Sequence, residues 1–288
     1  MLVLLAAVGS ATASGTVPVN LYEWIAVAPC VAAAEFREED GKFAVVRLEE
    51  VFRGDLAPGT RVAVDLRRAN RDREEGRTAL RFEPERRYLV LLKRDPSRSR
   101  HELPVYDLVR GIEGTREIPA EGSRGILDAI GHFVRIQDRK DEIAAWKAIR
   151  EMLDATNPLL LETSLDLFLK FRRGDAELLP ALRPILDHPR PDLRARAARL
   201  IGQIVGGRAG GGLSDDGAVL AELYGHARRD PSAEVRIAAT SALGGIQGSG
   251  PREVLREIAR SDPEQAVRYE AERLLFERDA GSKPKVAR

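Results

Sequence analysis

The fold is decided by ten residues, Asp230-Pro231-Ser232-Ala233-Glu234-Val235-Arg236-Ile237-Ala238-Ala239. A close copy, Asp-Pro-Glu-Gln-Ala-Val-Arg-Tyr-Glu-Ala, follows at 262–271, and a looser copy, His-Pro-Arg-Pro-Asp-Leu-Arg-Ala-Arg-Ala, precedes it at 188–197. Self-similar segments at such intervals are the signature of repeat architectures. The sequence therefore predicts a repeat protein, and stacked repeats are typical of binding surfaces.

Each copy begins with residues that are typical of the first turn of a helix. A proline stands five residues before the repeated arginine, where its fixed backbone suits the first helical turn. The aspartates before two of these prolines, Asp230 and Asp262, can accept hydrogen bonds from the free amides of that turn. One helix face gathers the positions one before, three after and seven after the arginine, which are Leu193, Ala197 and Ile201, then Val235, Ala239 and Leu243, then Val267, Ala271 and Leu275. The small alanine on this face lets a neighbouring helix approach.

The spacing of the copies defines the repeat. The arginines at 194, 236 and 268 are 42 and 32 residues apart, and the longer interval contains a glycine-rich insertion at 206–217. Partner helices are predicted at 178–186, 219–227 and 254–259. Helical hairpins of this period, with Asp-Pro-x-x-x-Val-Arg opening the second helix, resemble HEAT repeats of the type found in phycobilisome-lyase-like proteins. The resemblance covers about 141–279 and is most specific in the last two copies.

The resemblance also implies a role for the repeated charges. In that family the arginine and the aspartate commonly stack between adjacent repeats as a polar ladder, which implies structural roles for Asp230, Arg236, Asp262, Arg268 and Arg194. Direct contact with a ligand is the alternative. The earlier copies depart from the pattern in His188 at the aspartate position, Glu162 at the arginine position, and Pro180 and Pro184 in the helix before the first copy. Such departures are typical of terminal repeats.

A first helical hairpin is predicted before these copies, because the apolar spacing changes from two to 3.6 residues after a linking helix at 126–140. Its two apolar faces are Ile143, Trp146, Ala148, Ile149, Met152 and Leu153, and then Leu161, Leu165, Phe168 and Leu169. We expect the α-solenoid to extend over 141–280, with a disordered tail at 281–288.

The N-terminal half has the pattern of a small β domain over 20–125. Residues 21–28 fit either a helix or a strand, and strands are predicted at 30–36, 43–52, 62–66, 79–82, 87–92 and 104–109, with loops at 67–77 and 93–101. Short strands between turn residues favour a small antiparallel β-barrel or sandwich. The predicted fold class is thus a small antiparallel β-barrel followed by a short α-solenoid of HEAT-type hairpins.

The order of these strands is similar to the netrin-like, OB-type barrels of the tissue-inhibitor-of-metalloproteinase superfamily. The similarity lies in a long strand ending in Val51-Phe52-Arg53-Gly54, an alternating strand at 62–66 and the segment Glu-Arg-Arg-Tyr-Leu-Val-Leu-Leu at 85–92. In the inhibitors of that superfamily, a disulfide-bonded cysteine at the mature N-terminus chelates the protease metal. Here the only cysteine is Cys30, so that activity is not transferred to this chain. Its apolar neighbours favour a buried thiol over a reactive one.

Residues 1–13 are uncharged and apolar and end in Ala-Thr-Ala, which predicts a signal peptide cleaved before Ser14. We therefore expect an exported protein, periplasmic or extracellular, in a bacterium. The run is too short to cross a bilayer, and no later segment predicts insertion of the mature chain. The net charge of +1 gives no overall attraction to nucleic acid.

No pattern predicts catalytic, cofactor-binding or metal-binding residues. The glycine-rich segment 206–212 lacks the lysine of a phosphate-binding loop, and the four histidines lack metal-ligand spacing. The basic segment 93–101, together with the arginines at 67, 68, 71, 73 and 77, is interpreted as a solvated loop because no aromatic platform accompanies it. An anion-binding face is the alternative.

These observations predict a non-enzymatic protein-binding scaffold or adaptor that uses a face of the solenoid. The second helix of each hairpin is expected to line that face, with the contact candidates Arg196, Arg199, Thr240, Glu272 and Arg273. Two alternatives stay open: a netrin-like protease inhibitor acting through the barrel, and a lyase-like HEAT enzyme acting through the repeats. The partner protein and the oligomeric state are not specified by the sequence.

Overall fold

The computed structural model describes residues 20–40, 42–71, 80–109, 111–139, 141–207 and 217–281. The chain divides into two compact units between Ala148 and Ile149. The predicted signal peptide, the arginines at 73 and 77, most of the glycine-rich insertion and the tail after Gly281 lie outside the described residues.

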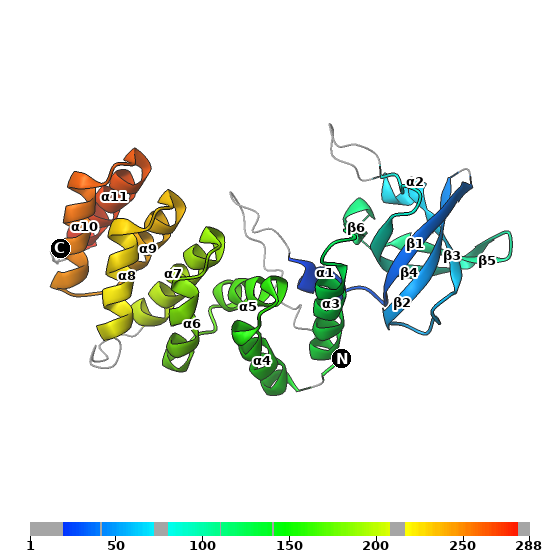
Figure 1. Cartoon of the computed structure of the whole chain (residues 1–288), viewed down its shortest axis with the longest axis horizontal. Helices are drawn as coiled ribbons and strands as arrows, with labels where there is room; N and C mark the ends of the chain where they lie inside the picture. The colour runs from blue at the N-terminus through cyan, green and yellow to red at the C-terminus, as the bar shows by residue number, and fades with distance from the viewer. Residues whose placement is uncertain are drawn as a thin grey trace, which may run out of the picture. The chain divides into compact units, whose positions relative to one another are not determined.

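The N-terminal unit contains a six-stranded sheet (Figure 1). Its strands are β1 (Cys30–Asp40), β2 (Phe43–Arg53), β3 (Arg61–Asp65), β4 (Arg87–Arg100), β5 (Leu103–Leu108) and β6 (Thr115–Ile118). The strand order is β1-β2-β3-β5-β4-β6, and β1 also pairs with β4, which closes a barrel. Inside it pack alternating side chains such as Ala32, Val46, Val64 and Val90.

The prediction of a wholly antiparallel barrel was wrong in one pairing. Strands β3 and β5 run parallel, while the other pairings are antiparallel. The reason is geometric, since the closed ring β1-β2-β3-β5-β4 has an odd number of members and cannot alternate direction all the way round. The domain is therefore a small mixed β-barrel.

Three local predictions in the barrel were also wrong. The basic segment 93–101 is not a loop, because β4 continues to Arg100 and forms a hairpin with β5. The predicted strand at 79–82 has no strand conformation over 80–82, although Phe82 is buried and stacks on Phe36 with ring centroids 5.9 Å apart. The loop at 67–77 begins inside a short helix, α2 (Leu66–Ala69).

The segments before β1 and after β6 form helices that accompany the barrel. The ambiguous segment after Asn20 forms α1 (Leu21–Ala26), and the linking helix is α3 (Ser123–Gln137), which starts and ends three residues earlier than predicted. Arg53, at the end of β2, joins them, because it donates to the carbonyl of Ile25 at 2.7 Å and to Asp138 at 2.7 Å. Cys30 is buried as expected, and burial raises the pKa of its thiol to about 11.

Helix α4 (Glu142–Glu151) spans the division between the units and continues as a short 3-10 turn, η2 (Met152–Asp154). Ile143 is 81% exposed, so its assignment to the apolar face was wrong. It lies about 200° around the helix from the buried Ala145, since successive residues turn by about 100°.

The C-terminal unit is a stack of helices (Figure 1). They are α5 (Pro158–Phe171), η3 (Ala176–Leu178), α6 (Leu179–Leu186), α7 (Pro191–Gly206), α8 (Gly217–Arg229), α9 (Ala233–Gly245), α10 (Ser249–Ser261) and α11 (Gln265–Gly281). The second helices of the hairpins pack in the order α5, α7, α9 and α11, and the first helices in the order α6, α8 and α10. The repeats predicted from the three copies are confirmed.

Candidate functional site

The repeated arginines and aspartates form ion pairs between successive repeats. Arg194 donates through Nε and Nη2 to both carboxylate oxygens of Asp230, at 2.9 and 2.8 Å. Arg236 makes the same two-fold contact with Asp262, at 2.9 and 3.1 Å. The aspartate side chains are only 2% exposed. We call these two contacts the ladder pairs.

Each arginine is also held by its own repeat. The remaining guanidinium nitrogen, Nη1, donates to a backbone carbonyl six residues earlier, at 2.8 Å for Arg194, 2.9 Å for Arg236 and 2.6 Å for Arg268. The guanidinium is thereby oriented before it meets a carboxylate. This fixed fork matches the geometry of a carboxylate group.

The aspartates of the ladder also serve their own helices. Asp230 accepts from the amide of Ser232 at 2.9 Å, and Asp262 accepts from the amide of Glu264 at 2.9 Å. Burial alone would raise the pKa of Asp230, but the hydrogen bonds from Arg194 and from the Ser232 amide hold it below its ordinary value. At the first copy His188 replaces the aspartate, and its Nδ1 accepts from the Arg190 amide at 3.1 Å.

Small residues allow the internal second helices to approach closely. Four and eight residues after the repeated arginine stand Ala198 and Gly202 in α7, and Thr240 and Gly244 in α9. A methyl group added at Gly202 would lie 2.4 Å from Cβ of Ala242, and one at Gly244 would lie 2.4 Å from a methyl of Leu274. The backbone approach therefore depends on these positions being small.

The matching positions on α11, four and eight residues after the repeated arginine, carry large side chains. They are Glu272 and Phe276, which are exposed, and Phe276 is 75% exposed. Tyr269, next to the repeated arginine, is 68% exposed. Arg268 contacts the carbonyls of Asp262 and Pro263 at 2.6 and 3.0 Å, and no carboxylate of the described residues pairs with it. We call Arg268, Tyr269, Glu272 and Phe276 the α11 face.

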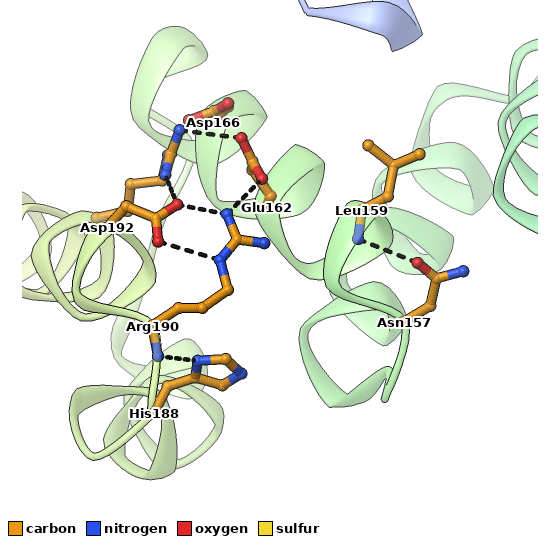
Figure 2. A network of polar contacts seen from close by, with 8 residues as sticks. Asn157, Leu159, Glu162, Asp166, His188, Arg190 and Asp192 are labelled. Atoms are coloured by element: carbon orange, nitrogen blue, oxygen red, sulfur yellow. Dashed lines mark hydrogen bonds and ion pairs between the residues drawn. The ribbon is translucent and has the colours of Figure 1, made fainter. Parts of the chain in front are cut away.

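A denser set of charges lies between α5 and α7. It consists of Glu162 and Asp166 on α5 with Arg190, Asp192 and Arg196 at the start of α7, and we call it the α5–α7 charge network. Figure 2 shows how Glu162, Arg190 and Asp192 of this network lie. Arg196 contacts all three acids, at 2.8 Å from Asp166, 2.9 Å from Asp192 and 3.1 Å from Glu162. Burial raises the pKa of Asp166, which the positive charge of Arg196 opposes.

The five residues predicted to contact a partner therefore differ in burial and in ion pairing. Arg196 belongs to the charge network, and Arg273 pairs with Glu270 at 2.8 Å and with Glu277 at 2.5 Å. Arg199 is exposed, 4.0 Å from Glu234, and Glu272 is exposed on α11. Thr240 is fully buried, so its prediction as a surface contact was wrong, because the next repeat covers that position of α9.

Sequence reasoning missed Tyr269 and Phe276. The signal was available in the register of the repeats, since position eight after the arginine is glycine in the two internal helices and phenylalanine in α11. A change from small to large at a helix-packing position predicts an exposed side chain there.

A shallow groove of about 630 Å³ lies along α8, lined by residues that include Arg183, Glu222, His226 and Asp230. Within the described ranges, no group of three or more His, Cys, Asp or Glu side chains is placed to hold a metal ion. No helix of the described residues is long and apolar enough to cross a membrane.

Comparison with known proteins finds HEAT repeats in the C-terminal half of the chain. A family model described as HEAT repeats matches residues 179–275. Among solved structures, a designed armadillo repeat protein is 15% identical, with a TM-score of 0.37, over 51% of this chain and 74% of that one. The S. pombe condensin Cnd3–Cnd2 subcomplex is 19% identical, with a TM-score of 0.34, over 53% of this chain and 21% of that one. No curated protein matches the chain.

Proposed function

We propose that the chain is an exported, non-enzymatic scaffold that binds another protein through its solenoid. HEAT repeats in the C-terminal half favour this, because stacked helical hairpins present extended surfaces to partner proteins. Many ionisable side chains of the repeats are engaged with one another, in the ladder pairs and in the α5–α7 charge network. A lyase-like activity gains no support from that arrangement.

The observation that carries the proposal is the α11 face. Arg268 is oriented by two backbone carbonyls in the same way as Arg194, which binds a carboxylate in two-fold fashion inside the molecule. Two exposed aromatic side chains accompany it, and aromatic and arginine residues are enriched at the energetic centres of protein interfaces. We infer that this face binds an aspartate or glutamate of a partner, with an apolar side chain of that partner against Phe276.

The size of Glu272 and Phe276 limits how closely a partner can pack against α11. The internal helices approach one another over small residues, whereas these two side chains project from α11 at the matching positions. A partner helix cannot approach as closely as α9 approaches α7. The proposed contact is therefore a side-chain interface and differs from one more HEAT-type stacking contact.

The experiment compares capture by the full chain and by single variants, using an extract of the native host. We expect a defined partner to be retained by the native chain, and to be lost by Arg268→Gln and by Phe276→Ser. Arg124→Gln, which changes an 81% exposed arginine on α3, is the matched control and should retain it. Equal capture by all four proteins, or capture of nothing by the native chain, would contradict the proposal.

Export is tested on the protein purified from the same host. We expect its first residue to lie near Ser14, after removal of residues 1–13. Material that still begins with Met1 would show that the segment is not cleaved.

A further inference from the structure

The barrel carries a cluster of arginines around one aromatic ring. The guanidinium carbons of Arg67, Arg98 and Arg100 lie 5.7, 5.5 and 5.8 Å from the ring centroid of Phe43. They come from distant parts of the sequence, because Phe43 opens β2, Arg67 lies on α2, and the other two lie on the far half of β4. We call these four residues the Phe43 cluster.

The cluster is positioned by a buried carboxylate. Asp65, at the end of β3, is 1% exposed and accepts from the amides of Arg67 and Arg68 at 2.9 and 3.3 Å, which fixes the start of α2. It also accepts from Arg98 at 2.7 Å. Burial alone would raise the pKa of Asp65, but the hydrogen bonds from Arg98 and the two amides lower it. Asp65 therefore stays ionised at neutral pH and orients the cations.

One carboxylate serves two of these arginines. Asp65 lies 2.7 Å from Arg98 and 3.5 Å from Arg67, so both share its charge. The next acids, Asp95 and Asp107, are engaged by Arg68, which hydrogen-bonds to Asp107 and lies 3.4 Å from Asp95. Asp95 reaches Arg98 only at 3.8 Å. The side chain of Arg67 is 50% exposed, and its ion pair with a described carboxylate is formed by Nε, at 3.5 Å from Asp65.

We propose that the Phe43 cluster is a binding site for a phosphate or sulfate group. Guanidinium groups donate in pairs to tetrahedral oxyanions, and stacking on an aromatic ring holds them in place without neutralising their charge. The basic segment after Lys93 lacked an aromatic platform in sequence, and β2 supplies that platform in the fold. The site lies in the barrel and does not depend on the proposed role of the solenoid.

The test is a calorimetric titration of the full chain with inorganic phosphate and with inorganic sulfate, at constant ionic strength set by sodium chloride. We expect saturable binding that Arg67→Gln weakens roughly tenfold, since a hydrogen bond to a charged group is worth about one factor of ten or more. Phe43→Leu should weaken it less, because the arginines remain but lose their ordering ring. Arg116→Gln, on the exposed part of β6, should leave binding unchanged.

Two further measurements separate the possible outcomes. In nitrogen-15 spectra, the Nε–H signals of Arg67 and Arg98 should shift during the phosphate titration, and unchanged circular dichroism should show that the variants fold. Binding of phosphatidylglycerol vesicles but of neither free anion would identify a lipid head group as the source of the phosphate. Equal weakening by Arg116→Gln, or no saturable binding of any of these probes, would overturn the proposal.

Discussion

Helix α7 makes two interfaces of opposite character. Toward α9 it presents small residues and one buried ladder pair, and Gly202 lets the backbones meet. Toward α5 it presents the α5–α7 charge network, whose side chains are 22% to 42% exposed. One interface is closed by packing around a single desolvated ion pair, and the other by many partly solvated ones.

The solenoid should therefore tolerate substitutions poorly at the α7–α9 interface and better at the α5–α7 interface. A buried pair is costly to break because the remaining charge keeps no partner, whereas solvated pairs contribute little individually. Close backbone contact likewise leaves no room for an added methyl group. The cost of a substitution should therefore depend on which of the two interfaces it changes.

The largest effect is expected from breaking a ladder pair. Asp262→Ala removes the carboxylate that Arg236 contacts through two nitrogens, and it leaves a guanidinium that is only 8% exposed without its counter-charge. We expect a loss of about 3–5 kcal/mol in the free energy of unfolding. Urea denaturation followed by circular dichroism measures it.

A solvated pair between neighbouring first helices provides the control for that variant. Glu257, on α10, accepts from Arg228 at 2.7 and 2.8 Å, but its side chain is 52% exposed. Glu257→Ala should cost less than about 1 kcal/mol. Similar losses for the two variants would show that burial does not distinguish the ladder pairs.

A smaller effect is expected from the packing stripe. Gly202→Ala places a methyl group 2.4 Å from Cβ of Ala242, so α7 and α9 must separate, which should cost about 1–3 kcal/mol in the free energy of unfolding. Gly225→Ala on α8 meets no atom within 4 Å and should be neutral or stabilising by up to about 1 kcal/mol, because alanine favours helix. Thermal unfolding of both variants compares them, and a stabilised Gly202→Ala would contradict the close approach.

The repeats could be predicted from the sequence because their marker residues stand at constant spacings from one another. The proline, the capping aspartate and the arginine recur together, and each has one structural use. By contrast, the prediction that Thr240 lines an exposed face of a second helix was wrong, because the adjacent repeat covers that position.

The barrel was predicted less accurately, because the residue pattern of two segments does not match their backbone conformation. Phe82 and its neighbours have the pattern of a strand, but the segment contributes its ring to the core without joining the sheet. The charged end of β4 has the pattern of a loop, yet its backbone pairs with β5 as far as Arg100. The sequence groups Arg67 with the basic segment 93–101 as an alternative anion-binding face, but it could not predict the contribution of Phe43, since the ring meets these arginines only when β2, α2 and β4 are folded.

The pH dependence of stability also separates the two interfaces, and the smallest expected effect is that of the Asp166 carboxylate in the charge network. Asp230, in a ladder pair, has a lowered pKa, so it contributes stability above its unfolded pKa of about 3.9 and loses it as the pH falls through its folded value. Asp166, in the charge network, has a raised pKa, so the folded state holds its proton more tightly. Its contribution therefore becomes less favourable as the pH rises from about 3.9 through its folded value.

Replacing each aspartate by asparagine should therefore change stability in opposite directions. At about pH 7, Asp230→Asn is expected to destabilise, and Asp166→Asn to be neutral or stabilising by less than about 1 kcal/mol, because Arg196 still has Glu162 and Asp192. Both differences should shrink at low pH, where the native carboxyl groups become protonated. Urea denaturation across this range measures them. A destabilised Asp166→Asn at neutral pH would mean that the network, like the ladder, depends on every one of its charges.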